Sequence, residues 1–281
     1  MKKSYQHRKP GKPGEFQHKH SLGQNFLSDA ALLTALIDET GVGKGDHILE
    51  VGPGAGDMTR LLCARCDSVT AVEIDSDLLP ILRVVMEPYD NFTLVQGNIL
   101  RVNLPELMAG KGPWHVVANI PYYLTTDLMN LLLQGNLPLK SVNVMVQKEA
   151  AQRVLAAPST PEYGPLTLRA QYYARPRLAR IVEAACFTPP PKVDSAFLCM
   201  PFREEPPVSV PDEKRFFKLI NAAFALRRKT LCNNLMSAYR LERMDAAAWI
   251  ARAGLAENVR GEALTMEEFA ELARMEENAL S

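Results

Sequence analysis

The feature that most constrains the fold of this 281-residue chain is a regular alternation of short apolar runs with longer amphipathic stretches between residues 46 and 147. Apolar runs predict strands at 47–51, 68–74, 91–96, 114–120 and 140–147, and amphipathic stretches predict helices at 57–65, 77–86 and 125–134. Strands that alternate with helices of this length indicate βαβ units. We therefore expect an α/β fold with a mostly parallel sheet.

The whole chain divides into three predicted regions. Residues 1–16 are rich in Lys, His, Gly and Pro and predict a disordered basic arm. Residues 17–204 form the α/β domain, which opens with a helix capped by Ser28 or Asp29 and closed by Gly41, and which gains antiparallel strands from 179–187 and 195–202. Proline-rich residues 203–212 read as a linker, and helices predicted at 213–228, 245–255 and 265–275 indicate a small all-α C-terminal domain over 205–281.

Composition narrows the class of protein. The five cysteines are scattered, and the C-x-x-C of Cys63 and Cys66 falls in a predicted helix without a second pair, so we expect packed thiols and no metal site. No signal peptide and no apolar run of about 18 residues is found, so we expect a cytoplasmic protein without a membrane span. Lys+Arg (32) balances Asp+Glu (32) overall, but local basic stretches suggest contact with a polyanion.

A glycine-rich turn, E50VGPGAGDMT59, joins the first predicted strand to its helix. Glycines at 52, 54 and 56 permit a tight turn and a close approach to a ligand. The dinucleotide pattern G-x-G-x-x-G would need its third glycine where this chain has Asp57, and no Lys-Ser/Thr pair follows for a P-loop. The Glu50 and Asp57 carboxylates would repel a pyrophosphate, but they would suit a ligand that carries a sulfonium and an ammonium group.

Polar side chains also follow the next two strands. Glu73 ends the second strand, where its carboxylate can accept hydrogen bonds from both ribose hydroxyls of an adenosine. Asn98 follows the third strand, where its amide oxygen can accept from an adenine amino group. Each taken alone is as consistent with a cap or a turn. Together, at successive strand ends, they favour S-adenosyl-L-methionine and a Rossmann-like methyltransferase domain.

The stretch N119IPYYLTT ends the fourth strand on the same edge. If the substrate is an exocyclic amine on a nucleobase, the Asn119 oxygen and a main-chain carbonyl exposed by the Pro121 kink can hold its two hydrogens. The nitrogen is then aimed at the methyl group without an obligatory general base. Tyr122 would stack on the flipped base, the alternative being a turn followed by a packed tyrosine.

A second aromatic residue comes from F187TPPPKVDSAF. Three consecutive prolines stiffen the loop after Phe187, so the loop can present this ring to the other side of a base. The alternative is a core phenylalanine before a proline turn.

Eight blocks together resemble the ribosomal RNA adenine N6-dimethyltransferases. They are G23QNFL, E50VGPGAGDMT, E73ID, N119IPYYLTT, Q147KEAAQRV, Y163GPLTL, F187TPPPKVDSAF and F224ALRRKTLCNNL. The match is closest to the bacterial branch that dimethylates two adjacent adenosines near the 3′ end of small-subunit (16S) rRNA. The macrolide-resistance branch, which modifies large-subunit rRNA, is similar in its first domain.

The resemblance implies roles for individual residues. Those implied to bind the cofactor are Asn25, Leu27, Gly52, Glu73, Asn98 and Asn119, and those implied to hold the target base are Asn119, Tyr122 and Phe187. One position departs from the family, which usually has Asp where this chain has Asn98. An amide keeps an acceptor oxygen but loses the charge, so we expect cofactor binding to persist in a weaker form.

Basic residues predict how RNA is held. Arg227, Arg228 and Lys229 are expected on a helix beside Phe224, and the run 169–180 adds four arginines without an acid. The alternative for either stretch is a solvated charged face. We expect a monomeric enzyme that acts on the small ribosomal subunit. Alternatives are an assembly factor that mainly binds immature subunits, a large-subunit rRNA adenine methylase, and a DNA adenine methylase, against which the helical C-terminal domain argues.

Overall fold

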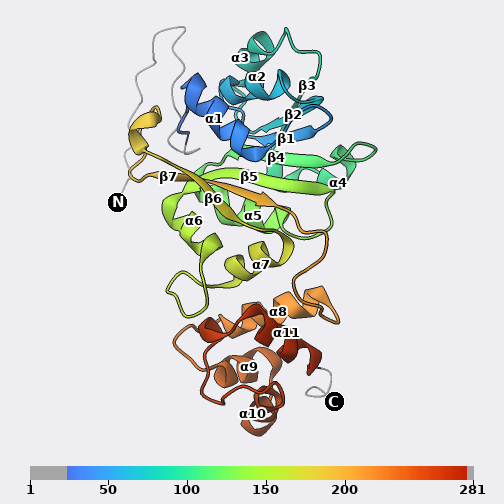
Figure 1. Cartoon of the computed structure of the whole chain (residues 1–281), viewed down its shortest axis with the longest axis vertical. Helices are drawn as coiled ribbons and strands as arrows, with labels where there is room; N and C mark the ends of the chain where they lie inside the picture. The colour runs from blue at the N-terminus through green and yellow to red at the C-terminus, as the bar shows by residue number, and fades with distance from the viewer. Residues whose placement is uncertain (1–23, 277–281) are drawn as a thin grey trace, which may run out of the picture.

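A computed structural model describes residues 24–276, in which a seven-stranded sheet and its helices lie above a lobe made of helices alone (Figure 1). The strands are β1 (His47–Val51), β2 (Ser68–Glu73), β3 (Phe92–Gln96), β4 (Trp114–Asn119), β5 (Leu139–Gln147), β6 (Arg177–Val182) and β7 (Ser195–Pro201). Their order is β3-β2-β1-β4-β5-β7-β6. The first five strands pair in parallel, and β7 pairs antiparallel with β5 on one side and β6 on the other, so the last two strands add antiparallel pairs as the sequence predicts.

Helices cover both faces of the sheet. One face packs against α1 (Ala30–Thr40), α2 (Asp57–Cys63) and α3 (Leu79–Val85). The other packs against α4 (Leu104–Leu107), α5 (Thr125–Leu132), α6 (Lys148–Leu155) and α7 (Pro165–Tyr173). Short 3₁₀ turns lie at η2 (Ile99–Arg101), η3 (Tyr122–Leu124) and η4 (Ala184–Cys186). The central strands are buried on both sides, which explains why they read as apolar runs without alternation.

The first helix begins and ends where local chemistry predicts. The Asp29 side chain accepts hydrogen bonds from the backbone N–H groups of Ala31 and Leu32, so Asp29 and not Ser28 is the N-cap. Gly41 closes the helix in the left-handed conformation (φ 70°).

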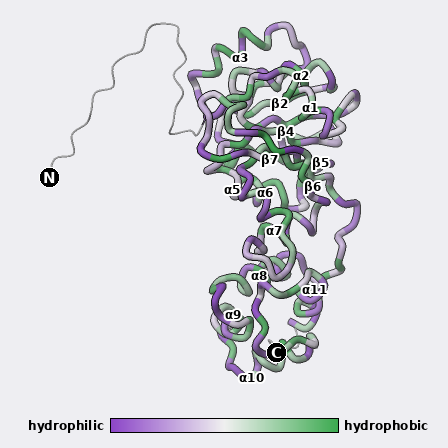
Figure 2. Tube along the Cα trace, turned by 60° about the vertical axis from the view of Figure 1, so that its left-hand side comes forward, coloured by the Kyte–Doolittle hydropathy of each residue, from purple (hydrophilic) through white to green (hydrophobic). Residues whose placement is uncertain are grey.

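The lower lobe has its own apolar core. It contains α8 (Glu213–Ala223), α9 (Leu231–Tyr239), α10 (Arg243–Arg252), the 3₁₀ turn η5 (Gly261–Ala263) and α11 (Met266–Arg274). The same core takes in Tyr163, Leu168 and Tyr172 from the α7 region and Val208 from the proline-rich segment. Figure 2 shows α7 between the sheet domain and the helices of the lobe. The helical lobe therefore packs directly on the sheet domain and does not hang on a free linker.

The helix predicted over 213–228 is shorter in the structure. It ends at Ala223, and residues 224–228 form a turn. The buried side chain of Asn234 causes this: its Nδ2 donates to the Ala223 carbonyl and its Oδ1 accepts from the Leu226 N–H. These hydrogen bonds come from the next helix, and they satisfy the backbone carbonyl and N–H groups that a further turn of α8 would have paired.

Four α-helices in the structure were not predicted: α4, α6, α7 and α9. Local signals for two of them exist in the sequence, because α7 begins with Pro165 and Thr230 caps α9 by accepting from the Asn233 N–H. In α6 the chain passes straight from strand to helix at Gln147, without a capping side chain.

The basic arm predicted over 1–16 lies outside the described residues. Cys63 and Cys66 are both free and buried, and burial raises the pKa of the Cys66 thiol to about 11. Within residues 24–276 no group of three His, Cys, Asp or Glu side chains forms a possible metal site. No helix in that range is both long and apolar enough to cross a membrane.

Candidate functional site

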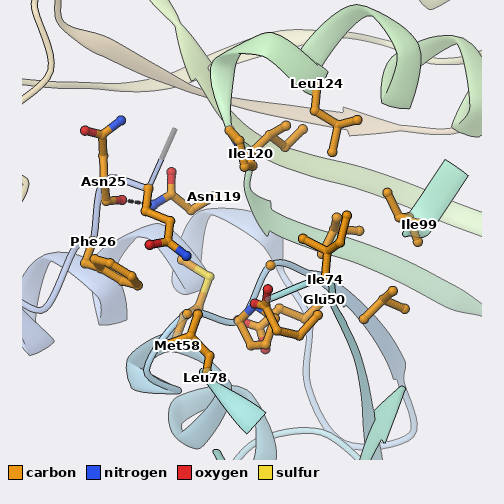
Figure 3. A pocket seen from close by; sticks show the side chains of 18 of the residues that line it. Asn25, Phe26, Glu50, Met58, Ile74, Leu78, Ile99, Asn119, Ile120 and Leu124 are labelled. Atoms are coloured by element: carbon orange, nitrogen blue, oxygen red, sulfur yellow. Dashed lines mark hydrogen bonds between the residues drawn. The ribbon is translucent and has the colours of Figure 1, made fainter. Parts of the chain in front are cut away.

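A pocket opens at the carboxyl ends of the parallel strands (Figure 3). Four of its polar residues lie at or just after strand ends: Glu50 on β1, Glu73 at the end of β2, Asn98 after β3 and Asn119 at the end of β4. The sequence predicts this convergence, because the carboxyl ends of parallel strands meet at one edge of the sheet. Segment 24–27 covers the pocket from the amino-terminal side and brings Asn25 and Leu27 to it.

The glycine-rich turn depends on glycine at two positions in particular. Gly52 (φ 71°) and Gly54 (φ 62°) both adopt the left-handed conformation. A Cβ on Gly54 would lie 2.8 Å from the Phe26 ring, so the missing side chain lets Phe26 pack onto the turn. Phe26 was not predicted as a site residue, and only this tertiary contact reveals it.

Glu50 is a buried carboxylate at the floor of the pocket, 2% exposed. Its pKa is raised from 4.5 to about 8, mainly by burial and to a smaller extent by the nearby Glu73 carboxylate, while the Thr59 hydroxyl opposes the shift. Its Oε2 has no hydrogen-bond partner among the described residues. A buried acceptor without a partner is costly, so this atom is suited to a positively charged or N–H-bearing ligand.

Glu73 is held in place by the backbone. Its Oε1 accepts from the Asp75 N–H at 2.7 Å, and backbone N–H groups of Ile74 and Gly54 also favour its charged form. Burial outweighs them and raises the Glu73 pKa. Asp75 in turn accepts from the Gln24 side chain at 2.8 Å, which ties segment 24–27 to the end of β2.

Asn98 lines the pocket and also caps η2. Its Oδ1 accepts from the Leu100 N–H at 3.0 Å, which uses one of the two acceptor sites of the oxygen predicted to meet adenine. The other site on the oxygen and the Nδ2 donor remain for a ligand. The adenine role of Asn98 stays a prediction.

Asn119 has a fixed orientation. Its Nδ2 donates to the Asn25 carbonyl at 2.9 Å, the dashed line in Figure 3, and its Oδ1 makes no hydrogen bond within residues 24–276. The following Ile120 N–H donates to Met145 on β5, while the Ile120 carbonyl, just before Pro121, receives no described hydrogen bond. Two acceptor oxygens, one from a side chain and one from the main chain, therefore lie on neighbouring residues at the pocket.

Tyr122 lies on η3 directly after this corner. Its hydroxyl is 2.8 Å from the Ser195 Oγ on β7, and burial raises its pKa, so the phenol stays neutral. The ring is half-buried and lines the pocket.

Phe187 is not brought to the pocket in this structure. Its side chain is 3% exposed and belongs to the apolar core that contains Leu27. Phe26 and Thr188 exchange two backbone hydrogen bonds, Phe26 N–H to Thr188 at 2.9 Å and the reverse at 2.8 Å. This isolated bridge draws the proline loop against segment 24–27, which buries Phe187. In the described conformation Phe187 is therefore a core phenylalanine before a proline turn, and it does not face the pocket.

The predicted RNA-binding residues lie on the turn between α8 and α9, in the helical lobe. Arg227 forms an ion pair with Glu262 at 3.2 Å and donates to the backbone carbonyls of Pro161 and Tyr163. Arg228 and Lys229 are exposed and make no ion pair within the described residues. Arg227 therefore ties the turn to the sheet domain, and its two neighbours carry the free charge.

Comparisons with known proteins agree with this architecture. Residues 15–276 match the family described as "Ribosomal RNA adenine dimethylase". "Ribosomal RNA small subunit methyltransferase A" of Lactococcus lactis is 44% identical over 264 residues, 92% of this chain and 90% of the relative. The protein of the same name from Clostridium acetobutylicum is 41% identical over 257 residues, 92% and 93% of the two chains.

Solved structures show the same fold. A dimethyladenosine transferase from Plasmodium falciparum superposes with a TM-score of 0.71 at 22% identity, over 88% of this chain and 95% of that one. The 23S rRNA methyltransferase ErmE superposes with a TM-score of 0.68 at 24% identity, over 89% and 99%.

Proposed function

This chain belongs to the ribosomal RNA adenine dimethylase family, and we propose that it dimethylates two adjacent adenosines near the 3′ end of small-subunit (16S) rRNA. The observation that carries the proposal is the Asn119 side chain, whose amide is held by the Asn25 carbonyl while its oxygen stays available at the pocket. The two curated relatives named above are both called small-subunit methyltransferases, which supports the choice of ribosomal subunit.

The pocket residues fit S-adenosyl-L-methionine. The partnerless Oε2 of buried Glu50 can accept a hydrogen bond, and this carboxyl becomes charged when a cation binds beside it. The glycine turn leaves room beside Gly52, and the Glu73 carboxylate lines the pocket and can accept from ribose hydroxyls. We assign Asn25, Leu27 and Asn98 to the same ligand. When bound, this cofactor supplies a methyl group activated by a sulfonium.

The residues of this chain orient the target amine. The exocyclic amine of adenine has its lone pair delocalised into the ring, which makes it a poor nucleophile. The Asn119 Oδ1 and the Ile120 carbonyl accept its two hydrogens, and the nitrogen then becomes more tetrahedral, with its lone pair directed into the pocket. The amine does not need a His or a carboxylate as a general base. The two acceptors hold its two protons during methyl transfer, and bulk water then removes one of them.

Tyr122 supplies a flat surface for the flipped base, and its hydrogen bond to Ser195 fixes the ring. Phe187 would complete a sandwich only if the bridge between Phe26 and Thr188 opens. We propose that RNA binding opens it and releases the Phe187 ring.

The helical lobe, for which we keep the boundary 205–281, is assigned to RNA binding through Arg228 and Lys229. Their exposure and lack of partner acids suit phosphate contacts. We propose a monomer that acts in the cytoplasm on small subunits, with the basic turn positioned on rRNA while the target adenosine enters the pocket of the sheet domain. The same surface would serve the second candidate function, binding of immature subunits without turnover.

The test uses small subunits whose rRNA lacks the two dimethyladenosines, incubated with S-adenosyl-L-methionine carrying a labelled methyl group. The expected result is label recovered as dimethyladenosine at two adjacent positions near the 3′ end, with none on methylated subunits or large subunits. Tight binding of subunits without label would support the assembly role. Label on large subunits alone would contradict the proposal.

A further inference from the structure

Tyr123 is a feature of the pocket that the assigned roles do not use. It lines the pocket and is 59% exposed, whereas the other tyrosines of the described range are buried or half-buried. Within residues 24–276 the Tyr123 side chain makes no hydrogen bond and no ring contact. Exposure alone is ordinary for a tyrosine. An unpaired aromatic ring beside the proposed site of base flipping is free to contact bound RNA.

The turn that carries Tyr123 is rigid and directs it away from its neighbour. Residues Tyr122–Leu124 form a 3₁₀ turn that is fixed by the Leu124 N–H donating to the Pro121 carbonyl at 2.9 Å. In a 3₁₀ helix consecutive side chains leave the axis about 120° apart, because there are about three residues per turn. The Tyr122 hydroxyl is bound to Ser195, which is fully buried in the sheet. With Tyr122 directed toward the sheet, Tyr123 is directed outward.

We propose that Tyr123 is a second stacking site, which holds the nucleotide adjacent to the adenosine whose amine lies at Asn119. The inference rests on the proposed function. Flipping one of two adjacent adenosines takes away the stacking partner of the other. The Cα atoms of the two tyrosines are about 3.8 Å apart, and their side chains leave the turn in different directions, so one ring can face the flipped base while the other faces the next nucleotide outside the pocket.

The chemistry of stacking suits a site that must process both members of an adenosine pair. An aromatic ring contacts the face of a base and does not read its N6 group, so Tyr123 holds an unmodified adenosine and a dimethylated one alike. The same platform therefore serves before and after the first adenosine of the pair is modified. A hydrogen-bonding residue at this position would distinguish the two states.

The test compares wild type with Tyr123→Ala, Tyr123→Phe and the control Ile74→Ala. Ile74 is a matched control because it lines the same pocket and is 49% exposed, but follows the end of β2. Substrates are unmethylated small subunits whose rRNA carries either the normal neighbour or an abasic nucleotide next to one target adenosine. Initial rates of methyl transfer and, by calorimetry, the Kd for S-adenosyl-L-homocysteine are measured for each protein.

A stacked base is worth at least about fivefold, so Tyr123→Ala is expected to lower kcat/KM on normal subunits about fivefold or more, chiefly through KM. Tyr123→Phe stays within about twofold of wild type, since the ring face is kept. The abasic substrate slows wild type, Tyr123→Phe and Ile74→Ala, but causes no further loss in Tyr123→Ala. The Kd for S-adenosyl-L-homocysteine does not change in Tyr123→Ala.

Three results would overturn the second stacking site. One is a Tyr123→Ala protein as active as wild type, and another is full sensitivity of that variant to the abasic neighbour. The third is a loss of S-adenosyl-L-homocysteine affinity that accounts for the whole effect, which would place the ring at the cofactor. If wild type itself transfers no methyl group to these subunits, the proposed function fails instead, which is a different outcome.

Discussion

Glu50→Gln is the substitution that tests the electrostatics of the pocket most sharply. The buried Glu50 carboxyl has its pKa raised from 4.5 to about 8, mainly by burial. Because the pKa of Glu50 is higher in the folded protein than in the unfolded chain, its contribution to stability is fully present below pH 4.5. This contribution is lost as the pH rises through about 8, where the folded protein must hold an unpaired buried charge. At about 1.4 kcal/mol per unit, the loss is on the order of 5 kcal/mol. Glutamine keeps the shape of the side chain and does not titrate.

The assay is urea unfolding of both proteins at pH 5 and at pH 9. Local relaxation and water entry reduce the full value. We therefore expect the free energy of unfolding of Glu50→Gln minus that of wild type to be larger at pH 9 than at pH 5 by at least about 2 kcal/mol, so that the variant gains in relative stability. A difference that is the same at the two pH values would refute the assignment of the raised pKa to Glu50.

Cofactor affinity gives the same substitution a second readout. A cationic ligand favours the Glu50 carboxylate, so binding below pH 8 must release a proton. The wild-type affinity for S-adenosyl-L-methionine is therefore expected to rise with pH from 6 to 8, at most about tenfold per unit, and then to level off. Glu50→Gln should bind more weakly and without this slope.

Three further substitutions test separate parts of the molecule. In Gly261→Ala the new Cβ would lie 2.7 Å from the Ala223 carbonyl oxygen, and urea unfolding should show a loss of about 1–3 kcal/mol. Asn98→Asp restores a charged acceptor while keeping the η2 cap, and calorimetry should show S-adenosyl-L-methionine binding about three- to tenfold tighter. Replacing both Arg228 and Lys229 by alanine should weaken subunit binding and reduce the slope of log K against log salt by about 1–2, with cofactor affinity unchanged.

Gly261→Ala and the double alanine variant each have a matched control, and Asn98→Asp has a contradicting result. Gly43→Ala places its Cβ in open space and should be close to neutral, so equal losses at the two glycines would refute the steric argument. Arg83→Ala removes a charge from α3, far along the chain from the basic turn, and should leave the salt slope intact. Unchanged cofactor affinity in Asn98→Asp would show that residue 98 does not contact adenine.

The sheet and the polar ends of its strands could be predicted because their signals are local. Buried parallel strands read as apolar runs, and chain direction alone brings Glu73 and Asn119 to one edge. What the sequence could not give depends on contacts between distant residues. The end of α8 is set by Asn234 from the next helix, and the burial of Phe187 by a bridge to Phe26.

The basic run R227RK illustrates the same limit. Its composition suggests three equivalent RNA contacts, yet Arg227 pairs with Glu262 and reaches the Pro161 carbonyl. The sequence alone does not distinguish Arg227, which anchors the turn, from Arg228 and Lys229. The reason is that the two partners of Arg227 lie 35 and 66 residues away in sequence.

The most direct test of the whole account is methyl transfer to unmethylated small subunits by wild type and by Asn119→Ala, with S-adenosyl-L-homocysteine binding measured in parallel. Removing one oriented acceptor is expected to lower kcat by about a hundredfold or more. Binding of S-adenosyl-L-homocysteine should fall by much less, because Glu50 and Glu73 are untouched. Dimethyladenosine formed at the wild-type rate by Asn119→Ala would contradict the claim that this amide orients the target amine.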